Sequence, residues 1–219
     1  MLFHISEEPD IQRFEPRRSE FTTEPVVWAI DDDRLRNYLV PRDCPRVTYY
    51  AGPQTTTADK EKFLLSSTAI VAIEQRWLER ARQCRLHCYH LPPRTFECID
   101  ECAGYFVSRV SVVPACVDVL EDPLCELQRR GVELRILDSL WPLRDAVVAS
   151  SLQFSIIRMR NALPSRAGEA ASRLSTPPAT DLGSSSRKHA TGRPRFEGGV
   201  REIVRPSFLR NRRRLGQSD

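Results

Sequence analysis

The chain of 219 residues has no long apolar run. No stretch approaches the roughly 18 consecutive apolar residues that a membrane span needs. The signatures of common nucleotide-binding and hydrolytic sites, G-x-x-x-x-G-K-[ST], G-x-G-x-x-G, G-x-S-x-G and H-E-x-x-H, do not occur either. We therefore expect no membrane span, and none of the mechanisms that depend on these motifs.

Lysine is scarce, and a secretory signal is missing. Only three of the 33 basic residues are lysines, and the first ten residues carry three acidic groups in place of a basic and then apolar segment. Seven cysteines without an export signal favour a reducing compartment. We expect a soluble, intracellular protein that is cytoplasmic, or nuclear if the source is eukaryotic, with no membrane partner.

The charges divide the chain into two parts. Residues 1–160 hold 21 basic and 24 acidic residues, whereas residues 161–219 hold 12 and 5 and have a net charge of +7. The second part is rich in Ser, Ala, Gly, Pro and Arg, which cannot form an apolar core. We predict a globular domain over residues 1–161 and a disordered basic tail over residues 162–219. A chain truncated after Asn161 should then keep its thermal midpoint within a few degrees.

Hydrophobic patterning within the first part alternates between strands and helices. Strands are predicted at residues 2–5, 26–30, 47–50, 69–73, 85–91, 105–113 (in two pieces) and 132–137. Helices are predicted at residues 31–39, 58–64 after a Thr57 cap, 77–83, 119–130 and 139–161, the last with Leu143, Val147, Phe154 and Ile157 on its apolar side. The predicted fold class is α+β, a single domain with a central mixed or antiparallel sheet and packed helices.

Two cysteine pairs, Cys84/Cys88 and Cys98/Cys102, resemble metal ligands. Both have C-x-x-x-C spacing, which differs from the C-x-x-C of most zinc sites. If residues 85–91 form a strand, Cys84 and Cys88 lie about 13 Å apart at roughly 3.3 Å per residue, too far to share one ion. We therefore expect no structural metal.

A basic cluster near the end of the chain could bind nucleic acid through phosphate contacts. It consists of Arg210, Arg212, Arg213 and Arg214. Its ordinary interpretation is a solvated charge run, because Phe208 is the only aromatic residue beside it that could stack on a base.

Three residues of the first part have the chemistry needed to cleave a nicotinamide riboside bond. His4 on the first strand could bind a ribose hydroxyl, Tyr38 could stack on a flat cationic ring, and Glu133 could stabilise a developing oxocarbenium ion. Each also has an ordinary interpretation, as a core histidine, a core-facing helix residue and a solvent-facing strand residue.

Several stretches carry a resemblance at the level of a family. They are LFHISEEPDIQRFEPR, VWAID, VPRDCPRVTYYAGP, GYFVS and GVELRILDSLWPLRDAVVASSLQFS. They resemble a family of functionally uncharacterised bacterial and fungal proteins over residues 1–161, which implies no known activity.

The layout is also similar to the ADP-ribosyltransferase superfamily, in which successive motifs supply a histidine, a tyrosine and a glutamate. The resemblance implies an NAD-dependent enzyme in which His4 orients the ribose, Tyr38 stacks on nicotinamide and Glu133 is catalytic, with an unknown protein acceptor. Ile5 stands where that superfamily usually has glycine after its histidine. The alternatives are a non-catalytic module that binds a nucleotide or a protein, and a nucleic-acid-binding protein that acts through its tail.

Overall fold

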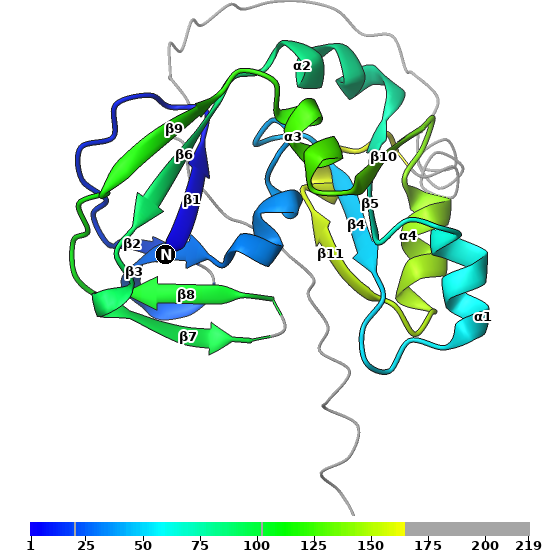
Figure 1. The fold of residues 1–219 in the computed structure, drawn as a ribbon, viewed down its shortest axis with the longest axis horizontal. Helices are drawn as coiled ribbons and strands as arrows, with labels where there is room; N and C mark the ends of the chain where they lie inside the picture. Colours follow the sequence, from blue (N-terminus) through cyan, green and yellow to red (C-terminus); the bar gives the residue numbers. More distant parts are fainter. Residues whose placement is uncertain (20, 102, 165–219) are drawn as a thin grey trace, which may run out of the picture.

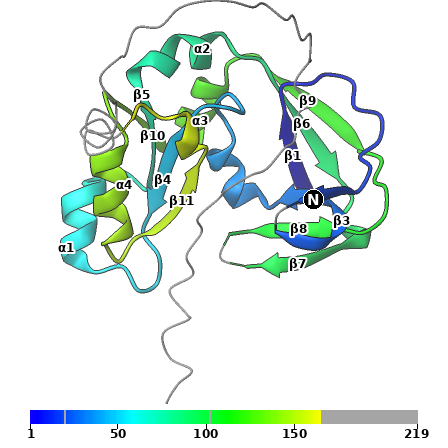
Figure 2. The same ribbon diagram turned by 180° about the vertical axis from the view of Figure 1, so that it is seen from behind.

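The computed structural model describes residues 1–19, 21–101 and 103–164. Within these residues the chain forms two β-sheets with a few short helices, which confirms the predicted α+β fold. The two sheets stand side by side, and helix α3 (Pro123–Arg129) lies between them in both views (Figure 1 and Figure 2). Residues 165–219, which include most of the predicted tail and its arginine cluster, lie outside the described residues.

The larger sheet has seven antiparallel strands. Their order is β7-β8-β3-β1-β6-β9, with β2 beside β3. The bounds are β1 Leu2–Ser6, β2 Arg17–Ser19, β3 Thr22–Ile30, β6 Leu86–Leu91, β7 Phe96–Asp100, β8 Tyr105–Ser108 and β9 Cys116–Leu120. One face carries the core of Leu2, Phe14, Val27, Tyr89 and Leu91, and the opposite face carries Ile30 and Cys88.

The smaller sheet has four strands in the order β10-β5-β4-β11. The bounds are β4 Arg46–Tyr50, β5 Ala69–Glu74, β10 Val132–Leu137 and β11 Gln153–Ile157. β10 is parallel to β5, and the other pairs are antiparallel. All residues of β4 and β5 are buried, because helices cover this sheet on both faces.

The remaining helices pack mainly on the smaller sheet. They are α1 (Thr57–Asp59), the π-helical turn η2 (Lys60–Leu64), the 3₁₀ turns η3 (Gln75–Trp77), η4 (Pro93–Thr95) and η5 (Met159–Asn161), α2 (Leu78–Gln83) and α4 (Trp141–Val148). η2 and α4 cover one face of the sheet, and α2 and α3 cover the other. Within the described part of the chain, no helix has the length and apolar character needed to cross a membrane.

The 3₁₀ helix η1 (Asp32–Asn37) leads from the larger sheet to the smaller one. Asp31 caps it, because its side chain accepts a hydrogen bond from the Arg34 N–H (2.9 Å). Leu35 packs on the larger sheet beside Ile30 and Cys88. The next residues of η1 contact β4 of the smaller sheet, so η1 lies at the boundary between the two sheets.

Several predicted elements differ from the structure. The predicted helix over residues 139–161 ends at Val148, and Phe154 lies on strand β11. The predicted helix over residues 119–130 begins only at Pro123, because residues 116–120 pair with β6 as β9. β2 and β7 were not predicted, and the cap of α1 is Thr56 rather than Thr57. Of the two strand pieces predicted within residues 105–113, only β8 forms, and the second is an isolated bridge between Val112 and Phe14. In each case strand pairing or a local cap outweighs the apolar spacing along the sequence.

Candidate functional site

One face of the smaller sheet is divided into an apolar half and a polar half. On this face β5 and β10 present Ala69, Val71, Ile73 and Val132, which pack against α2 and α3. β4 and β11 present Arg46, Thr48, Tyr50 and Ser155 instead. We call these four residues the polar strip.

The polar strip is buried along its whole length. Arg46 is 2% exposed, Thr48 is fully buried, and Ser155 lies directly opposite Thr48 in the antiparallel pair. Buried polar side chains are costly unless they are hydrogen-bonded. A strand of a fully covered sheet would normally carry apolar residues on both faces, so the strip requires a specific explanation.

η1 contacts both ends of the strip. At one end, the Arg46 Nε donates to the carbonyl of Asn37 (2.7 Å), and its guanidinium lies 5.6 Å from the centre of the Tyr38 ring. At the other end, the guanidiniums of Arg36 and Arg34 lie 4.2 and 5.2 Å from the centre of the Tyr50 ring. Thr48 is between Arg46 and Tyr50 on the same face of β4, so it faces the same helix.

Three buried polar atoms in this region have no hydrogen-bond partner. They are the Arg36 Nε, the Asn37 Oδ1 and the Thr48 Oγ1. The described residues contain only two other such atoms, the Trp77 Nε1 and the His87 Nδ1. The concentration of three on η1 and the facing residue of β4 marks a place where a bound group could supply the missing partners.

Positive charge also gathers around the strip. Burial lowers the pKa of Arg36, and Arg34 lowers it further. Burial likewise lowers the pKa of Arg158, which follows β11, and the nearby Arg160 and Arg42 add to the effect. Arg158 has a left-handed backbone (φ 56°), a conformation that is strained for a residue with a side chain. An anion bound here would relieve the repulsion among these guanidiniums.

The predicted residue His4 lies on the other face of its sheet, away from η1. Its Nδ1 donates to the carbonyl of Trp28 (3.0 Å), and its ring is 4.8 Å from the ring of Phe14. Because Phe3 and Ile5 pack toward η1, the alternation of β1 directs His4 to the opposite face.

The predicted residue Tyr38 directly follows η1 and lies between the sheets. Its hydroxyl shares a hydrogen bond of 3.3 Å with the hydroxyl of Tyr105 on β8, and its ring contacts Arg46. Of the three predicted site residues, only Tyr38 adjoins the polar strip.

The predicted residue Glu133 lies on β10 and faces the α4 side of the smaller sheet. It accepts hydrogen bonds from Ser67 (2.5 Å) and from the Nη2 of Arg135 (2.8 Å), and Arg135 also donates to the Tyr49 hydroxyl. The bond from Ser67 lowers the pKa of Glu133, and Arg135 lowers it further. The carboxylate is therefore held in an ion pair on the far face of the sheet from the strip.

The three predicted residues thus occupy three different layers of the protein. The larger sheet separates His4 from Tyr38, and the smaller sheet separates Tyr38 from Glu133. These side chains therefore do not line one pocket. The individual roles predicted for them, NAD as a cofactor and a protein acceptor stay predictions that the structure does not test.

A family comparison agrees with the uncharacterised family expected from the sequence. The profile described as "Family of unknown function (DUF6886)" matches residues 3–162. The chain belongs to this family. No curated protein and no solved structure matches it. The resemblance of this DUF6886 chain to the ADP-ribosyltransferase superfamily is therefore not supported.

The cysteines of the DUF6886 domain were the other predicted constellation. Cys84 precedes β6 and Cys88 lies on it, which confirms the predicted strand between them. Burial raises the pKa of Cys88 to about 12. Among residues 1–19, 21–101 and 103–164, no three or more His, Cys, Asp or Glu side chains are grouped to hold a metal ion. Cys102 lies outside these residues.

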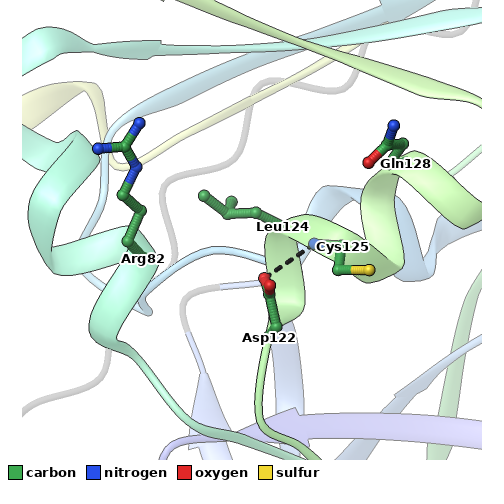
Figure 3. A pocket seen from close by; sticks show the side chains of 5 residues that line it. All are labelled: Arg82, Asp122, Leu124, Cys125 and Gln128. Atoms are coloured by element: carbon green, nitrogen blue, oxygen red, sulfur yellow. Dashed lines mark hydrogen bonds between the residues drawn. The ribbon is translucent and has the colours of Figure 1, made fainter.

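A depression of about 440 Å³ lies between α2 and α3 (Figure 3). It is lined by Arg82, Asp122, Leu124, Cys125 and Gln128. Arg82, Asp122 and Gln128 are exposed, and Asp122 caps α3 by accepting from the Cys125 N–H (2.9 Å). None of its side chains has a buried polar atom without a partner, so the polar strip is the stronger candidate site.

The pKa of His4 gives a prediction about pH. Burial lowers this pKa below its ordinary value of 6.5, and Arg42 and Arg17 lower it further against the hydrogen bond to Trp28. The unfolded chain therefore binds a proton first as the pH falls, so the stability contributed by neutral His4 is lost below about pH 6.5. Urea unfolding between pH 8 and 5 should show a smaller loss of stability for His4→Asn than for the wild type. Equal losses would contradict this assignment.

Sequence patterning alone could not identify the strip. The alternation of Arg46, Thr48 and Tyr50 has the period of a half-exposed strand, which would direct these residues to solvent. Only the position of η1 shows that they are buried instead.

Proposed function

We propose that this DUF6886 protein binds a small phosphate ester between η1 and the polar strip. The observation that carries the proposal is the group of three buried polar atoms without partners, the Arg36 Nε, the Asn37 Oδ1 and the Thr48 Oγ1. The proposal is a binding function, and it belongs to the class of nucleotide- or small-molecule-binding modules.

The donor and acceptor chemistry of these atoms favours a particular ligand class. The Arg36 Nε can only donate, the Asn37 Oδ1 can only accept, and the Thr48 hydroxyl can do either. The ligand must therefore offer both acceptors and at least one donor. A phosphate group attached to a hydroxyl-bearing sugar satisfies both requirements.

The charge around the strip favours the phosphate group in particular. Arg34 and Arg36 both stack on the Tyr50 ring, which concentrates positive charge at this end of the strip. Both side chains are half-buried, so this end of the strip reaches solvent. Charge-assisted hydrogen bonds from guanidiniums are the strongest available to phosphate.

Calorimetric titration with ribose 5-phosphate at low salt should detect binding, whereas ribose should bind much more weakly. Arg36→Gln should weaken the binding of ribose 5-phosphate by about tenfold or more, because a charge-assisted hydrogen bond is worth roughly 1.5–3 kcal/mol. Arg85→Gln is the matched control, since Arg85 is an exposed arginine that pairs with Glu121 on the surface. Equal affinities of the two variants would contradict the proposal.

Thr48→Val gives a second test, because it separates binding from stability. The valine removes an unpartnered hydroxyl from a fully buried position, so the free protein should be as stable as the wild type or more stable by about 0.5–1 kcal/mol. The same change should lower the affinity for ribose 5-phosphate several-fold. A less stable Thr48→Val protein with unchanged affinity would show that the hydroxyl has a structural role only.

A further inference from the structure

A row of aromatic rings crosses the face of the larger sheet that is turned toward η1. The ring of Phe21 lies 6.4 Å from that of Trp28, and Trp28 lies 5.7 Å from Tyr105. The Tyr105 hydroxyl then meets the hydroxyl of Tyr38. The row therefore runs from the surface, where Phe21 is 47% exposed, to the tyrosine that contacts Arg46 of the polar strip.

The row is not a closed stack. Its neighbouring rings are nearly perpendicular, with interplanar angles of 85° and 86°. Trp28, Tyr105 and Tyr38 are all half-buried, so aromatic surface stays accessible along the row. Half-buried rings of this kind can accept a further flat ring, and a stacked base is worth roughly 1–3 kcal/mol.

The turn before β8 holds the row against η1. Gly104 has φ +64°, and its carbonyl accepts a hydrogen bond from the Asp31 N–H. A Cβ at this position would lie 2.4 Å from the Asp31 carboxylate and 2.6 Å from the side chain of Arg34. Only glycine allows this approach, which brings Tyr105 next to Tyr38.

From this arrangement we infer that the phosphate ester is a nucleoside monophosphate, whose base lies on the Trp28 and Tyr105 rings while its phosphate meets Arg36. Arg34 connects the two parts, because its side chain adjoins Gly104 beside Tyr105 and its guanidinium lies with that of Arg36 against the Tyr50 ring. The inference rests on the proposed function, because it places the phosphate at the polar strip. It adds that the ligand carries a flat ring, which the strip alone does not require. No reaction of the ligand is implied.

Calorimetric titration of the full chain with AMP, adenosine and ribose 5-phosphate tests the inference. AMP should bind about tenfold to hundredfold more tightly than ribose 5-phosphate. Trp28→Leu should lower the affinity for AMP by about tenfold and leave that for ribose 5-phosphate unchanged, whereas Trp28→Phe should give an intermediate affinity for AMP. Trp77→Leu, which alters a half-buried tryptophan against Arg80 away from the row, should change neither affinity.

The outcomes distinguish this inference from the proposed function. Equal affinities of the wild type for AMP and ribose 5-phosphate would overturn the stacked base and leave the phosphate site standing. The same conclusion follows if Trp28→Leu, with a wild-type thermal midpoint, weakens both ligands equally. Binding of neither phosphate ester, or binding of adenosine as tight as that of AMP, would overturn the proposed function itself.

Discussion

Replacing Arg46 with methionine should lower the free energy of unfolding by about 3 kcal/mol or more. The Arg46 side chain donates to the carbonyls of Asn37, Pro41, Arg42 and Cys44, which belong to the end of η1 and the loop that follows it. Asn37, Pro41 and Cys44 are buried, so their carbonyls have no water to replace the guanidinium. Each buried acceptor left without a partner costs about 1–3 kcal/mol.

Urea unfolding of Arg46→Met beside Arg85→Met measures this effect. Methionine keeps an apolar stem of similar length at both positions, but Arg85 and Glu121 are more than 60% exposed, so Arg85→Met should cost less than about 1 kcal/mol. Arg46→Lys should fall between the two, because one ammonium group cannot reach carbonyls on both sides of the loop. Similar stabilities of the two methionine variants would show that the loop does not depend on Arg46.

Arg46 thereby links the stability of the fold to the candidate site. Its bonds to Asn37 and its contact with Tyr38 fix the residues that face the polar strip and the aromatic row. A buried arginine that donates to several backbone carbonyls fixes the position of the loop beside the site. These hydrogen bonds explain why an arginine, whose burial costs desolvation free energy, stands on a fully buried strand.

The strands could be predicted from sequence more reliably than the helices. β10 matches its predicted bounds, Val132–Leu137, because its alternation leaves no other regular structure for these residues. β11 was predicted as helix, since the spacing from Val147 to Phe154 also fits a helical face. Pairing with β4, more than 100 residues earlier in the sequence, decides the outcome, and no local pattern contains that information.

The assignment of strands to the two sheets, and of side chains to the sheet faces, could not be predicted from the sequence. The order of His4, Tyr38 and Glu133 along the chain suggested one cleft, but sequence order does not determine which sheet a strand joins or which face it covers. β10 joins the smaller sheet through its parallel pairing with β5, whereas β1 lies in the larger sheet between β3 and β6. Glu133 therefore faces the α4 side, where Ser67 and Arg135 bind it.

The contacts of Leu163 at the end of the domain give the second large expected effect, which differs from the sequence-based expectation for a chain truncated after Asn161. Glu74 is fully buried, and both of its carboxylate oxygens accept from the Leu163 N–H, at 2.9 and 3.1 Å. The Trp141 Nε1 donates to the Leu163 carbonyl (2.6 Å). Truncation after Asn161 removes these partners and leaves the buried carboxylate, among the described residues, with its ion pair to Arg76, so it should cost about 2–3 kcal/mol.

Thermal unfolding of chains that end at Asn161 and at Pro164 should therefore differ by about 5–10 °C, with the shorter chain less stable. Substitutions in the full chain separate the hydrogen bond from the leucine side chain. Leu163→Pro removes the N–H that Glu74 binds and should reproduce much of the loss, whereas Leu163→Ala keeps the N–H and alters only a side chain that is 38% exposed. If Leu163→Ala proved as destabilising as Leu163→Pro, side-chain packing rather than the buried carboxylate would hold the end of the domain.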